Sequence, residues 1–149
     1  MDDALVIVEM AGAPVGKGRQ RARIASGKGR MFVQTYTPAK TRKYEAPLRL
    51  LAQAAMRGRP PFEGPLAMTV TAVMPIPQSW SQKKQQDAAA GLILPTVKPD
   101  WDNLGKPTDA FNEVVWRDDR QLADVRVLKV YGRRPCLRVE VRRPAGLLV

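Results

Sequence analysis

The stretch KPDWDNLGKPTDAFNEVVWRDDRQ, residues 98–121, decides how the rest of the chain is arranged. Its residues 103–115 predict a helix, and Asp102 before them is of the type that caps helix N-termini. RDDR, residues 117–120, predicts a turn after this helix. The chain can therefore run out along one helix and return, which would bring the two ends of the stretch close together.

Four strands are predicted around this stretch, three from alternating apolar and polar residues and one from its β-branched content. Downstream, VRVLKVY (125–131) and CLRVEVR (136–142) flank the turn signal GRRP and predict a hairpin. Upstream, LAMTVTAVM (66–74) and the β-branched run LVIVEM (5–10) predict two further strands. Strands on both sides of a helical segment indicate one mixed sheet with helices packed on it.

Two further helices are predicted between the strands. Residues 38–57 carry apolar side chains at spacings of three and four, with Thr41 as the N-cap. Pro47 either kinks this helix or divides it into a short lead-in and a main helix. SWSQ, Ser79–Gln82, matches a capping box and predicts a helix through Ala90.

The remaining segments are predicted to be loops. Residues 11–37, rich in glycine and in basic residues, predict a loop or a loose hairpin. Residues 92–97 predict a short strand or an extended loop. Because no repeat or linker divides the chain, we expect one α/β or α+β domain over residues 1–149, a mixed β-sheet packed with helices.

Composition excludes several classes of chemistry. The absence of histidine removes Ser-His triads and most zinc sites, and the single cysteine, Cys136, excludes an internal disulfide framework. Catalysis must then rest on carboxylates, lysine, tyrosine or a bound ion. No apolar run approaches the length of a membrane span, and residues 1–15 hold no basic residue, unlike a signal peptide. We expect a cytoplasmic protein without a membrane partner or a small-molecule cofactor.

Charge is distributed unevenly along the chain. The net charge is +11, yet residues 100–124 hold seven of the fourteen acids and three Lys or Arg, a local charge of −4. The other residues therefore carry +15. A basic body around an acidic island is typical of a nuclease that attracts phosphate and holds a cation. A basic protein with one solvated acidic face fits the composition equally well.

Three aspartates have a spacing that suits metal binding. Asp100 and Asp102 are two apart, which places both side chains on one side of an extended backbone. Asp119 follows Asp102 by seventeen residues, so three carboxylates can converge on Mg²⁺, and Mn²⁺ would accept the same ligands. Such an ion acidifies a bound water and allows phosphodiester hydrolysis without histidine. Lys106, one helical turn after Asp102, could stabilise the transition state.

The whole stretch resembles the signature of RusA-type Holliday-junction resolvases, in which KPD-x-DNL-x-K precedes DALNG-like and DD-x-Q segments. GKGRQRAR with YTPAKTRKYE resembles the basic lead-in of phage-type members. PIPQSWSQKK resembles their middle segment, and VLKVYG their last strands. The likeness thus covers nearly the whole chain, and its central motif is specific because it fixes several polar positions in a short stretch.

This resemblance implies a RusA-like mixed sheet with helices, a homodimer and branched DNA as substrate. It makes Asp100, Asp102 and Asp119 metal-binding catalytic carboxylates and Lys106 the catalytic lysine. Three further polar residues are expected beside them: Asn103, Asp109 and Asp118. A dimer suits a four-way junction, which has two-fold symmetry and requires two symmetric cuts.

Two positions depart from the family pattern. Lys106 and Asp109 are three residues apart where the family usually has four, and Glu113 stands where it usually has glycine. Pro107 favours the first turn of a helix and would move the helix start to about Lys106. Asp102 would then lie in the turn before the helix, and Lys106 need not share its face.

Basic residues form a candidate DNA-binding surface, predicted to comprise Lys17, Arg19, Arg21, Arg23, Lys28, Arg30 and Lys98. Most alternate with small residues in a glycine-rich stretch, which suits contacts along a phosphate backbone; a solvated basic loop is the alternative. Trp101 is expected to pack in the core, with stacking on a base as its alternative. Phe111 and Trp116 are also expected in the core.

Together these features predict a metal-dependent, structure-selective endodeoxyribonuclease that resolves four-way DNA junctions by paired, symmetric cuts. Two alternatives remain open. A non-catalytic nucleic-acid-binding protein of the same fold would need neither the metal nor the aspartates. A less selective nuclease would act on flaps or single strands, because junction selectivity depends on the shape of the dimer.

Overall fold

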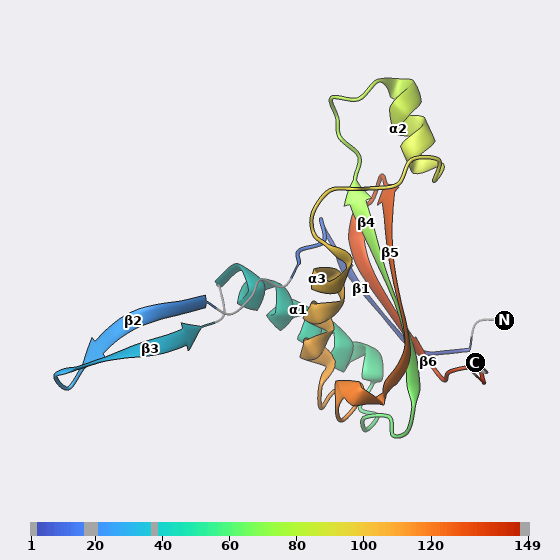
Figure 1. Cartoon of the computed structure of the whole chain (residues 1–149). Coiled ribbons are helices and arrows are strands. Elements are labelled where there is room, and N and C mark those ends of the chain that lie inside the picture. Colours follow the sequence, from blue (N-terminus) through green and yellow to red (C-terminus); the bar gives the residue numbers. More distant parts are fainter. Residues whose placement is uncertain (1–2, 17–20, 37–38, 147–149) are drawn as a thin grey trace.

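The computed structural model describes residues 3–16, 21–36 and 39–146 and has a mixed α+β fold (Figure 1). The strands are β1 (Ala4–Ala11), β2 (Arg21–Gly27), β3 (Arg30–Tyr36), β4 (Leu66–Pro75), β5 (Leu122–Gly132) and β6 (Cys136–Arg142). The helices are α1 (Ala39–Met56), α2 (Gln82–Ala89) and α3 (Trp101–Gly105), with 3₁₀ helices η1 (Lys106–Phe111) and η2 (Asp119–Gln121). The predicted fold class is confirmed, and β1, β4, β5 and β6 are the four predicted strands.

Four strands form a mixed sheet in the order β1-β6-β4-β5. Strand β6 is antiparallel to β1 and β4, whereas β4 and β5 are parallel. Parallel neighbours need a crossover connection, and here it contains α2, α3, η1 and η2. The acidic stretch is therefore the return path that carries the chain from one central strand to its neighbour.

The core lies between one face of the sheet and the helices beside it (Figure 1). In β6, Leu137, Val139 and Val141 are at most 1% exposed, while the alternate residues are half-buried on the other face. From α1, Leu48 and Ala52 are fully buried in the same core. Burial of one such aliphatic side chain contributes about 1.5–3 kcal/mol, so this packing fixes α1 on the sheet.

Helix α1 runs without a break from Ala39 to Met56 although Pro47 lies inside it. Pro47 therefore does not divide the helix, and the predicted division into a lead-in and a main helix is wrong. The prediction of Thr41 as N-cap is wrong, because the helix begins two residues before it. No helix in the described parts of the chain is long and apolar enough to cross a membrane.

The segment between β4 and α3 corrects one prediction. Helix α2 is capped by Ser81, whose side chain accepts a hydrogen bond of 3.2 Å from the Lys84 backbone N–H. The predicted capping box, which placed the cap at Ser79, is therefore wrong by two residues. Residues 92–97 form neither helix nor strand, so the extended loop is the correct alternative there.

The helix predicted over residues 103–115 is wrong at both ends. Helix α3 begins at Trp101 and ends at Gly105, and η1 follows with Pro107 in its first turn. Glu113 has φ +64°, a left-handed conformation that a continuing right-handed helix does not contain. The stretch therefore forms two short helical pieces instead of one long helix.

Strands β2 and β3 pair only with each other and form a hairpin that extends away from the main sheet (Figure 1). The two residues at its tip, Lys28 and Gly29, both have positive φ, as a type I′ hairpin turn requires. Of the two structures predicted for residues 11–37, the hairpin is correct over residues 21–36. We call residues 21–36 the arm.

Candidate active site

Helix α3 presents two carboxylates to solvent at its start. Asp100 occupies the N-cap position in extended conformation, yet its side chain makes no capping hydrogen bond. Asp102 lies in the first turn, where its Oδ1 accepts a hydrogen bond of 2.9 Å from the Asn103 backbone N–H. Both aspartates are exposed, whereas Leu104 of the same helix is fully buried. The helix is thus anchored by its apolar residue, and its carboxylates remain accessible.

This geometry corrects two expectations. Asp102 is not the N-cap, and strand alternation does not relate it to Asp100, because the backbone is helical from Trp101 onward. Trp101 is 69% exposed, so its predicted packing in the core is wrong. A large aromatic ring in solvent between two carboxylates fits the alternative, stacking on a base.

Lys106 lies beside Asp102 despite the proline that follows it. Its Nζ is 3.6 Å from Asp102 Oδ2 and donates a hydrogen bond of 3.2 Å to Asn103 Oδ1. The helix start that Pro107 predicted at about Lys106 is confirmed, since η1 begins there, and Lys106 nevertheless lies on the same side as Asp102. The ion pair is about half exposed and contributes little to stability, which leaves the ammonium free to serve another charge.

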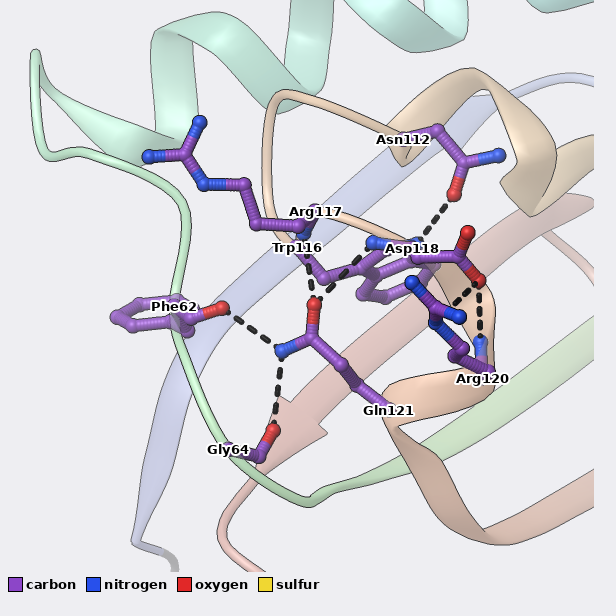
Figure 2. Close-up of polar contacts among 8 residues, drawn as sticks. All are labelled: Phe62, Gly64, Asn112, Trp116, Arg117, Asp118, Arg120 and Gln121. Atoms are coloured by element: carbon purple, nitrogen blue, oxygen red, sulfur yellow. Dashed lines mark hydrogen bonds and ion pairs between the residues drawn. The ribbon is translucent and has the colours of Figure 1, made fainter.

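The turn from Arg117 to Gln121 holds the second group of carboxylates, and Gln121 ties it in place (Figure 2). Gln121 Oε1 accepts hydrogen bonds from the backbone N–H groups of Arg117 at 2.8 Å and Asp118 at 3.2 Å. Gln121 Nε2 donates to the carbonyl oxygens of Phe62 at 2.9 Å and Gly64 at 3.0 Å. One side chain thus joins the turn to a segment before β4.

Asp118 has a structural role in the same turn (Figure 2). Its Oδ1 accepts a hydrogen bond of 2.9 Å from the Arg120 backbone N–H, and with Gln121 it forms a capping box for η2. This hydrogen bond lowers the pKa of Asp118 below its ordinary value. Asp118 is therefore not merely a solvated turn residue, because it caps η2, and its predicted place beside the metal site stays a prediction.

The base of the turn rests on Trp116, which is fully buried (Figure 2). Its Nε1 donates a hydrogen bond of 2.7 Å to Asn112 Oδ1, and its ring meets Phe111 edge-on at 5.6 Å. Phe111 is fully buried as well, so the prediction of both aromatic residues in the core is confirmed.

Asp119 lies in a region of concentrated negative charge. Partial desolvation, hydrogen bonding with Asp118, and repulsion by Asp109 and Asp118 raise the pKa of Asp119. The structure therefore brings Asp109 on η1 within electrostatic range of Asp119 on η2. A carboxylate that is destabilised by like charges is a common feature of functional sites, and a cation would relieve it.

The predicted convergence of Asp100, Asp102 and Asp119 on one ion stays a prediction. Among the described residues, no three His, Cys, Asp or Glu side chains are grouped closely enough to hold a metal ion. The donor set nevertheless fits Mg²⁺, because this ion is commonly held by one or two carboxylates, several waters and substrate phosphate. Asp100 and Asp102 on α3, with Asp119 on η2, are the exposed oxygen donors available for it.

The predicted DNA-binding residues fall into two places. Arg21 begins β2, and Arg23, Lys28 and Arg30 are exposed on the arm. Lys98 is exposed and lies just before α3, close in sequence to Asp100. Two further predicted contacts, Lys17 and Arg19, lie outside the described residues.

Two residues that fix the site were not predicted. Gln121 belongs to the DD-x-Q segment, so the motif was a signal for it, although its hydrogen-bond partners were not. Arg49 of α1 donates hydrogen bonds to the carbonyl oxygens of Ala110 at 3.2 Å and Asn112 at 3.3 Å. Arg49 thereby ties the end of η1 to α1, and no sequence pattern pointed to it.

Comparison with known proteins agrees with this arrangement. A family model described as Endodeoxyribonuclease RusA matches residues 11–142. The chain is also 38% identical over 136 residues to the uncharacterized protein YqaN of Bacillus subtilis (strain 168), an alignment that covers 88% of this chain and 91% of YqaN. Because the family match includes α3, η1 and η2 with all their carboxylates, this protein belongs to the RusA family of endodeoxyribonucleases, the Holliday-junction resolvases that its central motif resembles.

Proposed function

We propose that this protein is a metal-dependent endodeoxyribonuclease that acts as a homodimer on four-way DNA junctions and makes paired, symmetric cuts. The observation that carries the proposal is the exposed start of α3. There Asp100 and Asp102 remain accessible, and Lys106 lies 3.6 Å from Asp102. The Asp100 carboxylate makes no capping hydrogen bond, so its oxygens are available to a cation.

In this proposal Asp100, Asp102 and Asp119 hold Mg²⁺, or Mn²⁺ in its place. When bound, such an ion supplies an acidified water and neutralises charge on phosphate. The charge of the ion would offset the repulsion that Asp109 and Asp118 exert on the ionised form of Asp119. The three carboxylates would hold the ion beside the scissile phosphate, and the charge of the ion would offset their mutual repulsion and keep them ionised.

Lys106 has the role of stabilising charge. Its hydrogen bond to Asn103 and its pairing with Asp102 hold the ammonium on the same side of α3 as the Asp102 carboxylate. A preorganised cation beside the scissile phosphate stabilises the charge that develops on its oxygens. Loss of one such donor in other hydrolytic enzymes lowers the rate by about 100- to 1000-fold.

The homodimer follows from the symmetry of the substrate. A four-way junction has two-fold symmetry, and one copy of this chain carries one set of the candidate catalytic residues. Two chains related by a two-fold axis would present these sets to opposite strands, which gives two symmetric cuts. Branched DNA would also agree with the net charge of +11.

The test compares a synthetic four-way junction with a linear duplex, each incubated with Mg²⁺ or EDTA. We expect paired symmetric nicks in the junction alone, abolished by EDTA and by Asp119→Asn. Asp87→Asn is the matched control, because Asp87 is a surface carboxylate on α2 that pairs with Lys83 at 4.0 Å. It should cut as the unchanged protein does.

Other outcomes would select another function. Tight junction binding without cuts in Mg²⁺ or Mn²⁺ would support a non-catalytic binding protein of the same fold. Equal cutting of flaps, single strands and junctions would support a less selective nuclease. Cutting that survives Asp119→Asn would overturn the assignment of the catalytic carboxylates.

A further inference from the structure

The arm has two chemically different faces. Residues paired across an antiparallel hairpin share a face, and successive pairs alternate between the two faces. Ile24 pairs with Val33, and Met31 pairs with Ser26, which places these three large apolar side chains on one face. The opposite face carries Arg23 paired with Gln34, and Arg30 at the end of β3, together with the half-exposed ring of Phe32.

The apolar face of the arm is uncovered. Ile24, Met31 and Val33 are 72%, 75% and 70% exposed, far more than the apolar residues of the main sheet. A two-stranded hairpin with nothing packed on it is marginally stable in water, and an exposed apolar face on it indicates a binding surface. The face is therefore expected to be covered when the protein acts.

Charge identifies the class of partner. Residues 21–36 contain Arg21, Arg23, Lys28 and Arg30 and no acid, so the arm carries a charge of +4. A surface that is both strongly basic and apolar complements nucleic acid, whose phosphates are anionic and whose bases are flat and apolar. A two-stranded ribbon also has the width of a DNA groove, and apolar side chains of such ribbons can enter between base pairs.

We propose that the arm inserts Ile24, Met31 and Val33 against unstacked bases at the branch point of a DNA junction. Arg23, Lys28 and Arg30 bind the adjoining phosphates. The inference rests on the proposed function, since it assumes a branched substrate. Bases at a branch point have already lost stacking partners, so opening them costs less than opening a continuous duplex. The arm thereby favours junctions over linear DNA by insertion in addition to charge.

The experiment measures base opening without cleavage. A junction carrying 2-aminopurine at its branch point is titrated with the protein in EDTA, and its fluorescence is compared with that of a linear duplex carrying the same base. We expect fluorescence to rise in the junction and to stay unchanged in the duplex. Met31→Ser with Val33→Ser should abolish the rise. Leu50→Ser, which alters an apolar side chain that is 66% exposed on α1, should leave it intact.

Salt dependence separates insertion from charge. The double serine variant should keep the slope of log affinity against log salt, because it removes no cation. Arg23→Gln with Arg30→Gln should reduce that slope by about 0.9 for each phosphate that the variant no longer binds. A flatter slope for the serine variant would overturn the division of labour between the two faces.

Two results would overturn the inference. The first is an undiminished fluorescence rise in the double serine variant. The second is a shift of that variant from dimer to monomer in sedimentation, which would make a second copy of this chain the partner of the apolar face. The nuclease proposal is judged separately, because fluorescence is read in EDTA. Junction opening without cutting in Mg²⁺ would leave the arm inference standing and overturn the nuclease, and cutting without opening would do the reverse.

Discussion

The arm and the turn from Arg117 to Gln121 carry the two halves of the proposed activity, and they are held in opposite ways. Each strand of the arm pairs only with the other, and its large apolar side chains are mostly exposed. The turn is fastened by four hydrogen bonds to a single side chain, Gln121, and rests on the buried ring of Trp116. The arm is thus an independent unit, and the turn is continuous with the core.

This difference teaches how placement follows function. A carboxylate that must meet a scissile phosphate loses its effect with small displacements, so its turn is tied to a distant segment of the chain, at Phe62 and Gly64. A surface that follows the shape of a substrate gains from moving as a separate unit. Changes in the turn should therefore affect folding and activity together, whereas changes in the arm should affect binding alone.

The largest expected effect is a difference in unfolding free energy between variants of two tryptophans in the same stretch. Trp116→Ala removes a fully buried ring with its hydrogen bond to Asn112 and should lower the free energy of unfolding by about 3–5 kcal/mol. Trp101→Ala changes an exposed ring and should alter it by less than about 0.5 kcal/mol, while weakening junction cleavage. Urea unfolding measures both. Equal destabilisation by the two variants would contradict the assignment of Trp116 as the base of the turn.

A smaller effect compares two glutamines. Gln121→Ala leaves four backbone groups without their partner and should cost about 1–3 kcal/mol of stability. Cleavage should fall further than the unfolded fraction explains, because Asp119 loses its fixed position. Gln34→Ala, whose side chain accepts from Arg23 on the arm, should leave thermal unfolding of the main sheet unchanged. Wild-type cleavage by Gln121→Ala would show that the turn needs no such fastening.

The same contrast explains what sequence could predict. The four sheet strands could be predicted because their signals are local: alternation in three of them, as in CLRVEVR at residues 136–142, and β-branched content in the fourth. The hydrogen bonds of Gln121 could not, since its partners Phe62 and Gly64 lie 59 and 57 residues away. Long-range contacts of this kind have no local pattern.

The stretch around α3 shows a second limit. The sequence predicted one helix over residues 103–115, whereas a separate 3₁₀ helix begins at Lys106, with Pro107 in its first turn, and Glu113 has φ +64°. The site residues themselves were predicted from the motif, and the structure places Lys106 beside Asp102 as the motif implied. The exposure of Trp101 could not be predicted, because it depends on the helix beginning at that residue.

Positive φ provides a third, smaller test in both regions. Glu113 adopts φ +64° where the family usually has glycine, so Glu113→Gly should relieve backbone strain and stabilise the protein by up to about 1 kcal/mol. Loss of the exposed Glu113–Arg117 pair, 3.5 Å apart, would offset a few tenths of this gain. Lys28→Gly, with φ +52° at the tip of the arm, should leave the unfolding midpoint of the main sheet unchanged. Differential scanning calorimetry measures both, and destabilisation by Glu113→Gly would show that the left-handed conformation is not strained.

The smallest expected effect is a difference in the pH dependence of stability between the two neighbouring aspartates of the turn, Asp118 and Asp119. The pKa of Asp119 is raised by partial desolvation, by hydrogen bonding with Asp118 and by repulsion from Asp109, so the folded protein binds a proton there more tightly than the unfolded chain does. Its contribution to stability is complete below the unfolded pKa and is lost as the pH rises through the folded one. Asparagine is uncharged at every pH, like the protonated form of Asp119, so Asp119→Asn keeps that contribution at pH 7. The melting temperature of the variant should therefore exceed that of the unchanged protein at this pH. The difference should vanish on acidification below about pH 4.

Asp118 should show the opposite sign, which makes it the control. The hydrogen bond from Arg120 lowers its pKa, so ionised Asp118 stabilises the fold above its unfolded pKa, and this contribution is lost as the pH falls through the folded one. Asp118→Asn should therefore melt below the unchanged protein at pH 7. If both variants shifted in the same direction, the two carboxylates would share one environment. Shifts of melting temperature in opposite directions would mean that Asp118 holds the shape of the turn, whereas Asp119 is maintained at a cost in stability. If Mg²⁺ also raised the melting temperature only where Asp119 is present, that cost would belong to a ligand for a cation.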